Sequence, residues 1–221
     1  MKLNKIMLLV SCIMLINIFL PFGMVKAEST YVSSQKNISF TSSAGYTVKA
    51  TAMLPSGIKD DVPLVVMCHG YTGKKEGDGN RFIKLGNLLA SNGIAAITID
   101  FPGCGESPTD STNYTLSNMY KDIDSAINYM ATNYNIDTSN IGLTGHSMGG
   151  RVASLYTQSG GYSVKAIALW APANGDGANG KEFLSRGSFN FNYSQTFINE
   201  MDSSHPNSAL SNFSGETLLF I

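Results

Sequence analysis

The stretch Ile141-Gly142-Leu143-Thr144-Gly145-His146-Ser147-Met148-Gly149-Gly150 decides the fold of this chain of 221 residues. Its first four residues form a short apolar run, which is typical of a strand covered by helices on both faces. The pattern G-x-S-x-G follows, in which two glycines give the backbone room for a sharp turn that exposes a serine hydroxyl above a sheet. A helical pattern, Arg151 to Thr157, comes next. We therefore expect a strand, a tight turn that carries Ser147, and a helix.

Apolar runs of the same kind predict the other strands of the sheet. Three of them lie at 63–68, 95–100 and 166–170, and a fourth at 217–221 is expected to be another buried strand. The runs 37–40 and 46–53 predict a hairpin at the start of the domain, because apolar and polar residues alternate in the second of them.

Helical patterns separate these strands. Phe82, Leu85, Leu88 and Leu89 share one face of a helix that stops at Asn92-Gly93. A longer apolar stripe predicts a second helix, with the positions Leu116, Met119, Tyr120, Ile123, Ile127 and Met130. Both stripes are interpreted as core contacts. Alternation of strand and helix predicts an α/β domain with a doubly wound, mostly parallel sheet.

Three predicted strands end in residues of chemical interest. His69-Gly70-Tyr71 follows the strand at 63–68, the turn 100–105 follows the next, and His146-Ser147-Met148 follows the strand at 141–144. Ligands of such sheets bind beyond the carboxyl ends of the strands, so we expect these three turns to meet at one rim.

In the order and spacing of these motifs, nearly all of residues 28–221 resembles the α/β-hydrolase superfamily. The segment 69–73 looks like the family's oxyanion loop, the segment 100–107 like its D-x-x-G-x-G-x-S turn, and 145–150 like its nucleophile elbow. In appearance the chain is closest to the cinnamoyl (feruloyl) esterase, monoacylglycerol lipase and serine-aminopeptidase-like group. That resemblance implies a carboxylic-ester substrate and a serine esterase.

The resemblance also implies roles for individual residues. Ser147 would be the nucleophile that forms an acyl-enzyme, and the backbone N–H groups of Tyr71 and Met148 would stabilise the oxyanion. Gly145 and Gly149 would be the glycines of the elbow. His69 and His146 would shape their loops, and the role of Asp100 would be structural.

A catalytic acid and a catalytic base are not visible in the residues given. In the family they follow the serine in the order Asp or Glu, then His, and the chain ends at Ile221, directly after the last predicted strand. His205 is the one histidine downstream of Ser147, and its polar surroundings argue against a catalytic role. We therefore expect a C-terminally truncated hydrolase that lacks its last strand or strands and a helix, and whose activity is weak or absent. Two alternatives are a non-catalytic binding or regulatory protein and an assembly completed by a partner chain.

The N-terminus resembles an export signal. Lys2 and Lys5 precede an almost wholly apolar run, 6–25, and Val25-Lys26-Ala27 is similar to a signal-peptidase site. We expect residues 1–27 to be a signal peptide of a secreted or cell-surface protein, or an uncleaved membrane anchor. Its removal changes the formal net charge from −1 to −4, because three lysines and no acidic residue are lost. An acidic chain argues against nucleic-acid binding.

The composition of the chain predicts that residues 28–221 form one globular domain. Apolar residues make up 43% of the chain and charged residues 14%, which is enough to bury a sizeable core. Its cysteines, Cys68 and Cys104, are interpreted as unpaired and partly buried, although both follow predicted strands and could lie near each other. No nucleotide, cofactor or metal motif is present, the expected ligand is a small-molecule ester, and nothing in the sequence indicates an oligomeric state.

An insertion at about 172–213 interrupts the alternation of strand and helix. It is rich in Gly, Asn and Ser, yet it contains several aromatic residues: Phe183, Phe189, Phe191, Tyr193 and Phe197. It resembles a lid whose aromatic side chains could wall a pocket. The alternative is a surface loop that these side chains hold in place.

Overall fold

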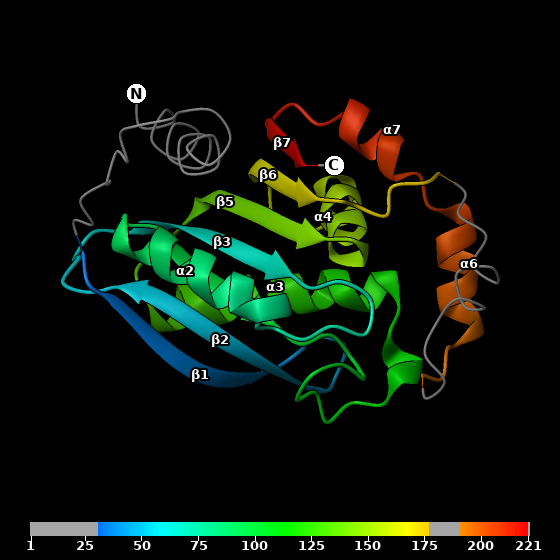
Figure 1. Cartoon of the computed structure of the whole chain (residues 1–221), viewed down its shortest axis with the longest axis horizontal. Coiled ribbons are helices and arrows are strands. Elements are labelled where there is room, and N and C mark those ends of the chain that lie inside the picture. The colour runs from blue at the N-terminus through cyan, green and yellow to red at the C-terminus, as the bar shows by residue number, and fades with distance from the viewer. Residues whose placement is uncertain (1–30, 177–190, 221) are drawn as a thin grey trace.

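The computed structural model describes residues 31–176 and 191–220, in which seven strands form one sheet between layers of helices (Figure 1). The strands are β1 (Ser33–Thr41), β2 (Thr47–Pro55), β3 (Val62–Cys68), β4 (Ala95–Ile99), β5 (Ile136–His146), β6 (Val164–Trp170) and β7 (Glu216–Phe220). The α-helices are α2 (Arg81–Ser91), α3 (Leu116–Asn133), α4 (Met148–Ser159), α6 (Gln195–Ser203) and α7 (Pro206–Ser211).

The sheet has the order β1-β2-β4-β3-β5-β6-β7. Neighbouring strands from β4 to β7 pair in parallel, whereas β2 is antiparallel to both β1 and β4. The doubly wound, mostly parallel α/β fold predicted from the sequence is therefore confirmed. The chain passes from β3 to β4 on one side and returns to place β5 on the other side of β3. The carboxyl ends of β3 and β5 thus form the switch point of the sheet, where such folds bind ligands.

Helices cover both faces of the sheet. In Figure 1, α2 lies in front of it, while α3 and α4 lie behind it. Phe82 and Leu89 of α2 pack on one face of the sheet, beside Met53 and Met67. On the other face, the predicted stripe of α3 is buried as expected, apart from the partly buried Tyr120, and it joins the side chains of α4 in the larger core. These two cores fix the strands whose ends form the rim.

Three details differ from the predictions. β5 begins at Ile136, five residues before the predicted run, because its first half is polar and partly exposed and carries no apolar signal. Leu88 is 38% exposed, so it does not share the buried face of α2. β7 was expected to be buried but is largely exposed, with Leu219 48% exposed, because in the described residues only β6 pairs with it.

The whole predicted leader and part of the predicted insertion lie outside the described residues. These parts are residues 1–27 and the aromatic positions Phe183 and Phe189. Within the described residues, none of the helices combines the length and the apolar character needed to span a membrane.

Candidate active site

Ser147 occupies a strained turn between β5 and α4. Its backbone angles are φ 53° and ψ −115°, a conformation that residues other than glycine rarely adopt. Backbone hydrogen bonds hold this turn in place. The N–H of Ser147 donates to the carbonyl of Trp170 at 3.0 Å. The carbonyl of Ser147 accepts from the N–H groups of Arg151 at 3.1 Å and Ala173 at 2.9 Å. The strand, turn and helix predicted around this serine are all present.

Gly145 and Gly149 allow the backbone segments of the turn to approach closely. A Cβ atom at Gly145 would lie 2.2 Å from the carbonyl oxygen of Gly149. A Cβ atom at Gly149 would lie 2.0 Å from the carbonyl oxygen of Cys68, at the end of β3. Both neighbours are backbone atoms that cannot swing aside, so the packing of β5, α4 and β3 at this point excludes any side chain.

The loop after β3 faces Ser147. A Cβ atom at Gly70 would lie only 3.4 Å from the Cβ atom of Ser147. Between this loop, the segment 73–82 and the turn of Ser147 lies a cavity of about 280 Å³. It is lined by His69, Gly70, Tyr71, Gly73, Lys74, Gly77, Asp78, Arg81, Phe82, His146 and Ser147. The predicted convergence of the turns after β3 and β5 is therefore present.

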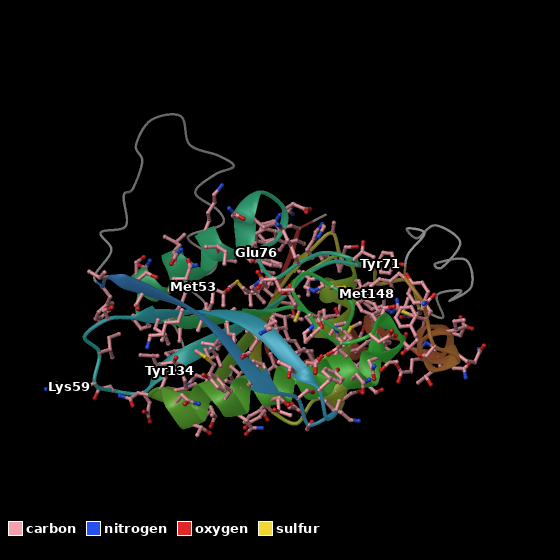
Figure 2. All side chains as sticks on the ribbon, turned by 90° about the horizontal axis from the view of Figure 1, so that it is seen from below. Met53, Lys59, Tyr71, Glu76, Tyr134 and Met148 are labelled. Atoms are coloured by element: carbon pink, nitrogen blue, oxygen red, sulfur yellow. The ribbon has the colours of Figure 1, made fainter. Side chains whose placement is uncertain are left out.

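Tyr71 lies in the loop after β3, and Met148 lies in the turn after β5, directly after Ser147. Tyr71 lines the cavity, and Met148 is buried at the first position of α4. The two residues lie near each other in Figure 2, in agreement with the close approach of Gly70 to Ser147. Because the first N–H groups of a helix have no partner within it, the N-terminus of α4 presents unpaired donors and a partial positive charge beside Ser147.

His69 is a structural bridge between two loops. Its Nε2 accepts from the N–H of Phe101 at 3.0 Å, so the ring proton must be on Nδ1, which donates to the carbonyl of Gly70 at 2.7 Å. Burial lowers the pKa of His69, which agrees with a neutral ring. Both nitrogens are occupied by backbone groups, so this histidine shapes the loop and is not free to take a proton from Ser147.

The other two histidines of the chain are also described. His146 lines the cavity, and burial together with the charge of Arg81 lowers its pKa. His205 is exposed at the start of α7. Among the described residues, no side chain forms a hydrogen bond with the hydroxyl of Ser147. The arrangement thus contains a serine, helix N–H donors and a cavity, without an imidazole aligned on the serine.

Asp100 ties the loop after β3 to the loop after β4. Its carboxylate is buried and accepts from the backbone N–H groups of Lys75 at 2.6 Å and Glu106 at 2.9 Å. The ammonium group of Lys75 lies 3.4 Å from the same carboxylate and 2.5 Å from Glu106. The structural role that we expected for Asp100 follows from these contacts, whereas the burial of Lys75 was missed, because nothing in the local sequence distinguishes it from a surface lysine.

Replacement of Asp100 by asparagine is expected to lower the free energy of unfolding by about 2 kcal/mol, since one buried N–H group would face an amide NH₂ group in place of an acceptor. Urea unfolding of the two proteins measures the difference. Asp60→Asn, at an exposed position, is the matched control and is expected to change stability by less than about 0.5 kcal/mol. A change of the same small size for Asp100→Asn would contradict the assignment.

The described aromatic residues of the insertion form a packed cluster. Phe191 and Phe197 each contact Tyr193 and the buried Tyr114, and Tyr193 stacks on Tyr71 with ring centroids 5.9 Å apart. Of this cluster, Tyr71 alone lines the cavity beside Ser147. In the described part of the chain, these aromatics thus hold the insertion against the loop after β3. This agrees with the alternative of a surface loop held in place by its aromatic side chains.

Both cysteines of the domain are unpaired, as predicted. Cys68 and Cys104 are buried more completely than expected, and burial raises the pKa of each thiol to about 12. They are therefore unreactive thiols of the core at neutral pH.

Comparisons with known proteins agree with this architecture. A family model described as alpha/beta hydrolase fold matches residues 63–215, well over half of the chain. A curated Escherichia coli relative, "Uncharacterized 31.7 kDa protein in traX-finO intergenic region", is 35% identical over 89 residues. That match covers 40% of this chain and 30% of the relative, so this chain matches less than a third of the relative's length.

Two solved structures have a similar fold. One contains bound ferulic acid, and the other is named as an acetyl xylan esterase. Est1E from Butyrivibrio proteoclasticus, with ferulic acid bound, has a TM-score of 0.66 and 18% identity, and the match covers 81% of this chain and 76% of that protein. An acetyl xylan esterase from Paenibacillus sp. R4 has a TM-score of 0.60 and 17% identity, with coverage of 96% and 76%. At these identities the likeness concerns the fold.

Proposed function

Because this chain belongs to the alpha/beta hydrolase fold family, we propose that it provides the nucleophile and the oxyanion site of a serine hydrolase that cleaves carboxylic esters. The observation that carries the proposal is the strained turn that holds Ser147 at the N-terminus of α4, beside a cavity at the switch point of the sheet. Backbone strain of this kind costs about 1–3 kcal/mol and persists where the surrounding structure enforces it, often at functional sites.

In this proposal the Ser147 hydroxyl oxygen attacks the ester carbonyl and the alcohol leaves, which yields an acyl-enzyme that water then hydrolyses. The negative charge that develops on the carbonyl oxygen is stabilised by the backbone N–H groups of Met148 and Tyr71. For Met148 the support is its place at the first position of α4, where the N–H groups of the helix are unpaired. For Tyr71 the support is its place in the loop that closes on Ser147.

The size of the cavity favours a small substrate. Its volume of about 280 Å³ is near the lower end of the range of about 300–1,000 Å³ for small-molecule sites. We therefore propose an ester with a short acyl group. The similarity in fold to an acetyl xylan esterase is in accord with that choice.

The three histidines of this chain do not serve as the general base in this proposal. His69 is bonded to two backbone groups, His205 is exposed at the start of α7, and His146 makes no hydrogen bond to the serine hydroxyl. When partners of a catalytic serine are missing, the oxyanion site and binding still retain about 10³ to 10⁴ of rate enhancement over water. We expect slow ester cleavage by the 221-residue chain alone.

Labelling with a fluorophosphonate probe tests the proposal. Mass spectrometry of the digested protein is expected to find the probe on Ser147, and Ser147→Ala is expected to remove both the label and the hydrolysis of 4-nitrophenyl acetate. Added imidazole is expected to accelerate labelling of the wild type, since it supplies a base that the described site does not align on the serine.

Ser159→Ala is the matched control, because Ser159 is an exposed serine of the same helix. It is expected to be labelled and to hydrolyse the ester like the wild type. A label on another residue, or unchanged hydrolysis by Ser147→Ala, would overturn the proposal. Ester binding without any label on Ser147, even with imidazole, would favour a non-catalytic binding protein.

A further inference from the structure

One buried side chain joins α6 and the segment after β6 to the first turn of α4. Arg151 is fully buried, and its terminal nitrogens make five hydrogen bonds. Nη1 donates to the carbonyls of Ala173 at 2.7 Å and Gly175 at 2.8 Å. Nη2 donates to the hydroxyl of Ser204 at 2.6 Å, and more distantly to the carbonyls of Met201 and Ser204. The guanidinium group therefore connects three separate parts of the chain.

Backbone carbonyls accept most of the hydrogen bonds of this guanidinium. In the described residues no carboxylate lies within salt-bridge distance of it. Its Nη2 instead faces the carboxyl end of α6 (Gln195–Ser203), where the carbonyls carry the partial negative charge of the helix. The position of α6 and the position of Arg151 thus depend on each other.

Arg151 also reaches the backbone of Ser147 through a single residue, Ala173. The carbonyl of Ala173 accepts from Arg151, and the N–H of the same residue donates to the carbonyl of Ser147 at 2.9 Å. Both Ser147 and Ala171 have positive φ angles, of 53° and 40°. Such conformations persist where neighbouring groups hold them, and here the held segment is the one bonded to Arg151.

The other contacts of α6 extend to the opposite side of the site. Phe197 packs against the rings of Tyr114 and Tyr193, and Tyr193 stacks on Tyr71 in the loop after β3. Glu200 separately anchors α6 on the N-terminus of α3, because its carboxylate accepts from the N–H group of Leu116 at 2.6 Å. One helix is thereby connected to both sides of the cavity beside Ser147.

We propose that Arg151 is a positioning residue, which holds Ser147 in its reactive backbone conformation by anchoring the segment after β6. The inference rests on the proposed function in so far as Ser147 is the nucleophile. The residue is not proposed to touch the substrate, and it acts through the backbone of Ala173.

Two readouts in the intact chain test this inference. The first is the rate constant for labelling of Ser147 by the fluorophosphonate probe, with imidazole present. The second is quenching of tryptophan fluorescence by acrylamide, because Trp170 is the one tryptophan of the chain and its carbonyl accepts the N–H of Ser147. Both are measured well below the melting temperature of each variant, so that global unfolding does not contribute.

Arg151→Met is expected to slow labelling at least about tenfold, since a misplacement of about 1 Å of a reacting group can cost about 10² in rate. It is also expected to increase the quenching of Trp170. Arg151→Lys is expected to restore part of both signals, because an ammonium group can reach some of the same carbonyls. Glu200→Ala, which removes hydrogen bonds from α6 to α3 but none of those made by Arg151, is the control and is expected to keep both signals within about twofold of the wild type.

The outcomes separate the inference from the proposed function. If the wild type is not labelled at all, the proposed function fails, and the quenching comparison then decides the inference. If Arg151→Met matches the wild type in quenching and in labelling, or if Glu200→Ala produces the same losses, Arg151 is not a positioning residue. Where Arg151→Met does not fold, Ser204→Ala, which removes the shortest hydrogen bond alone, is expected to shift both readouts in the same direction, and an unchanged result overturns the inference.

Discussion

Replacement of Gly149 by alanine is expected to lower the free energy of unfolding by more than about 4 kcal/mol, or to prevent folding, which places it among the largest effects of a single substitution. The added methyl group would lie 2.0 Å from the carbonyl oxygen of Cys68 and 2.5 Å from the carbonyl oxygen of His69. Both atoms belong to the backbone at the end of β3, so relief of the clash requires α4 to move away from the central strands. That movement would also displace Ser147, which precedes α4.

Urea unfolding, or the yield of soluble protein where no transition is found, measures this effect. Gly175→Ala is the matched control, because a Cβ atom at Gly175 meets no heavy atom within 4 Å and the backbone there has no positive φ angle. The control is expected to unfold like the wild type. A Gly149→Ala protein of unchanged stability would show that the close approach of α4 to β3 is absent in solution.

The second large effect is expected from a buried carboxyl group, and it depends on pH. Asp122 of α3 is buried beneath the β1–β2 hairpin and accepts hydrogen bonds from Ser42 at 2.5 Å and Tyr46 at 3.0 Å. Burial raises the pKa of Asp122 to about 7, although the hydrogen bonds from Ser42 and Tyr46 act in the opposite direction. The folded protein therefore retains a proton that the unfolded chain has already lost in the same pH range.

The sign of the effect follows from this difference. Since the folded state binds the extra proton, the contribution of Asp122 to stability is fully present below the unfolded pKa of 3.8 and is lost as the pH rises through about 7. The total loss is about 4 kcal/mol at most, from a shift of about three pKa units at about 1.36 kcal/mol each. We expect the free energy of unfolding to fall between about pH 4 and pH 7, and Asp122→Asn to remove most of that slope.

Urea unfolding at several pH values measures the slope for both proteins. The comparison uses the pH dependence, since asparagine also changes the hydrogen bonds to Ser42 and Tyr46 and so shifts stability at every pH. Asp60→Asn, in an exposed loop, is the control and is expected to retain the slope of the wild type. An identical slope in Asp122→Asn and the wild type would show that Asp122 is ionised in the folded protein throughout this range.

Most of the architecture could be predicted from local sequence signals. Six of the seven strands begin and end within four residues of their predicted runs. The parallel strands among them were recognised because strands covered on both faces are apolar throughout. The glycines around Ser147 predicted the turn, since close backbone approach excludes a side chain. The first half of β5 was missed because polar residues can pair in a ladder without an apolar signal. The exposure of β7 was missed because an apolar run does not reveal how many strands and helices will cover it.

The candidate site could be predicted in part for the same reason. The convergence of the turns that carry Tyr71 and Ser147 could be predicted because the carboxyl ends of parallel strands share one rim. The roles of Ser147, Tyr71 and Met148 came from the resemblance to the α/β-hydrolase superfamily and stay predictions. Arg151 was missed, since arginine in a helix is ordinarily exposed and its acceptors come from residues 22 to 53 positions later in the chain. Lys75 and Asp122 were missed in the same way, because their burial depends on loops and a hairpin distant in sequence.

The amino-acid sequence by itself determined the doubly wound sheet, the turn that carries Ser147, and the strand ends that surround it. These features follow from the periodicity of apolar residues and from glycine, which act within a few residues of the chain. The tertiary structure alone decided that His69 is bonded to two loops, that Arg151 joins α6 to Ser147, and that Asp122 is a buried carboxyl group. The physical reason is that hydrogen-bond partners, burial and pKa values belong to contacts between distant segments, and those contacts exist only once the sheet and its helices have packed.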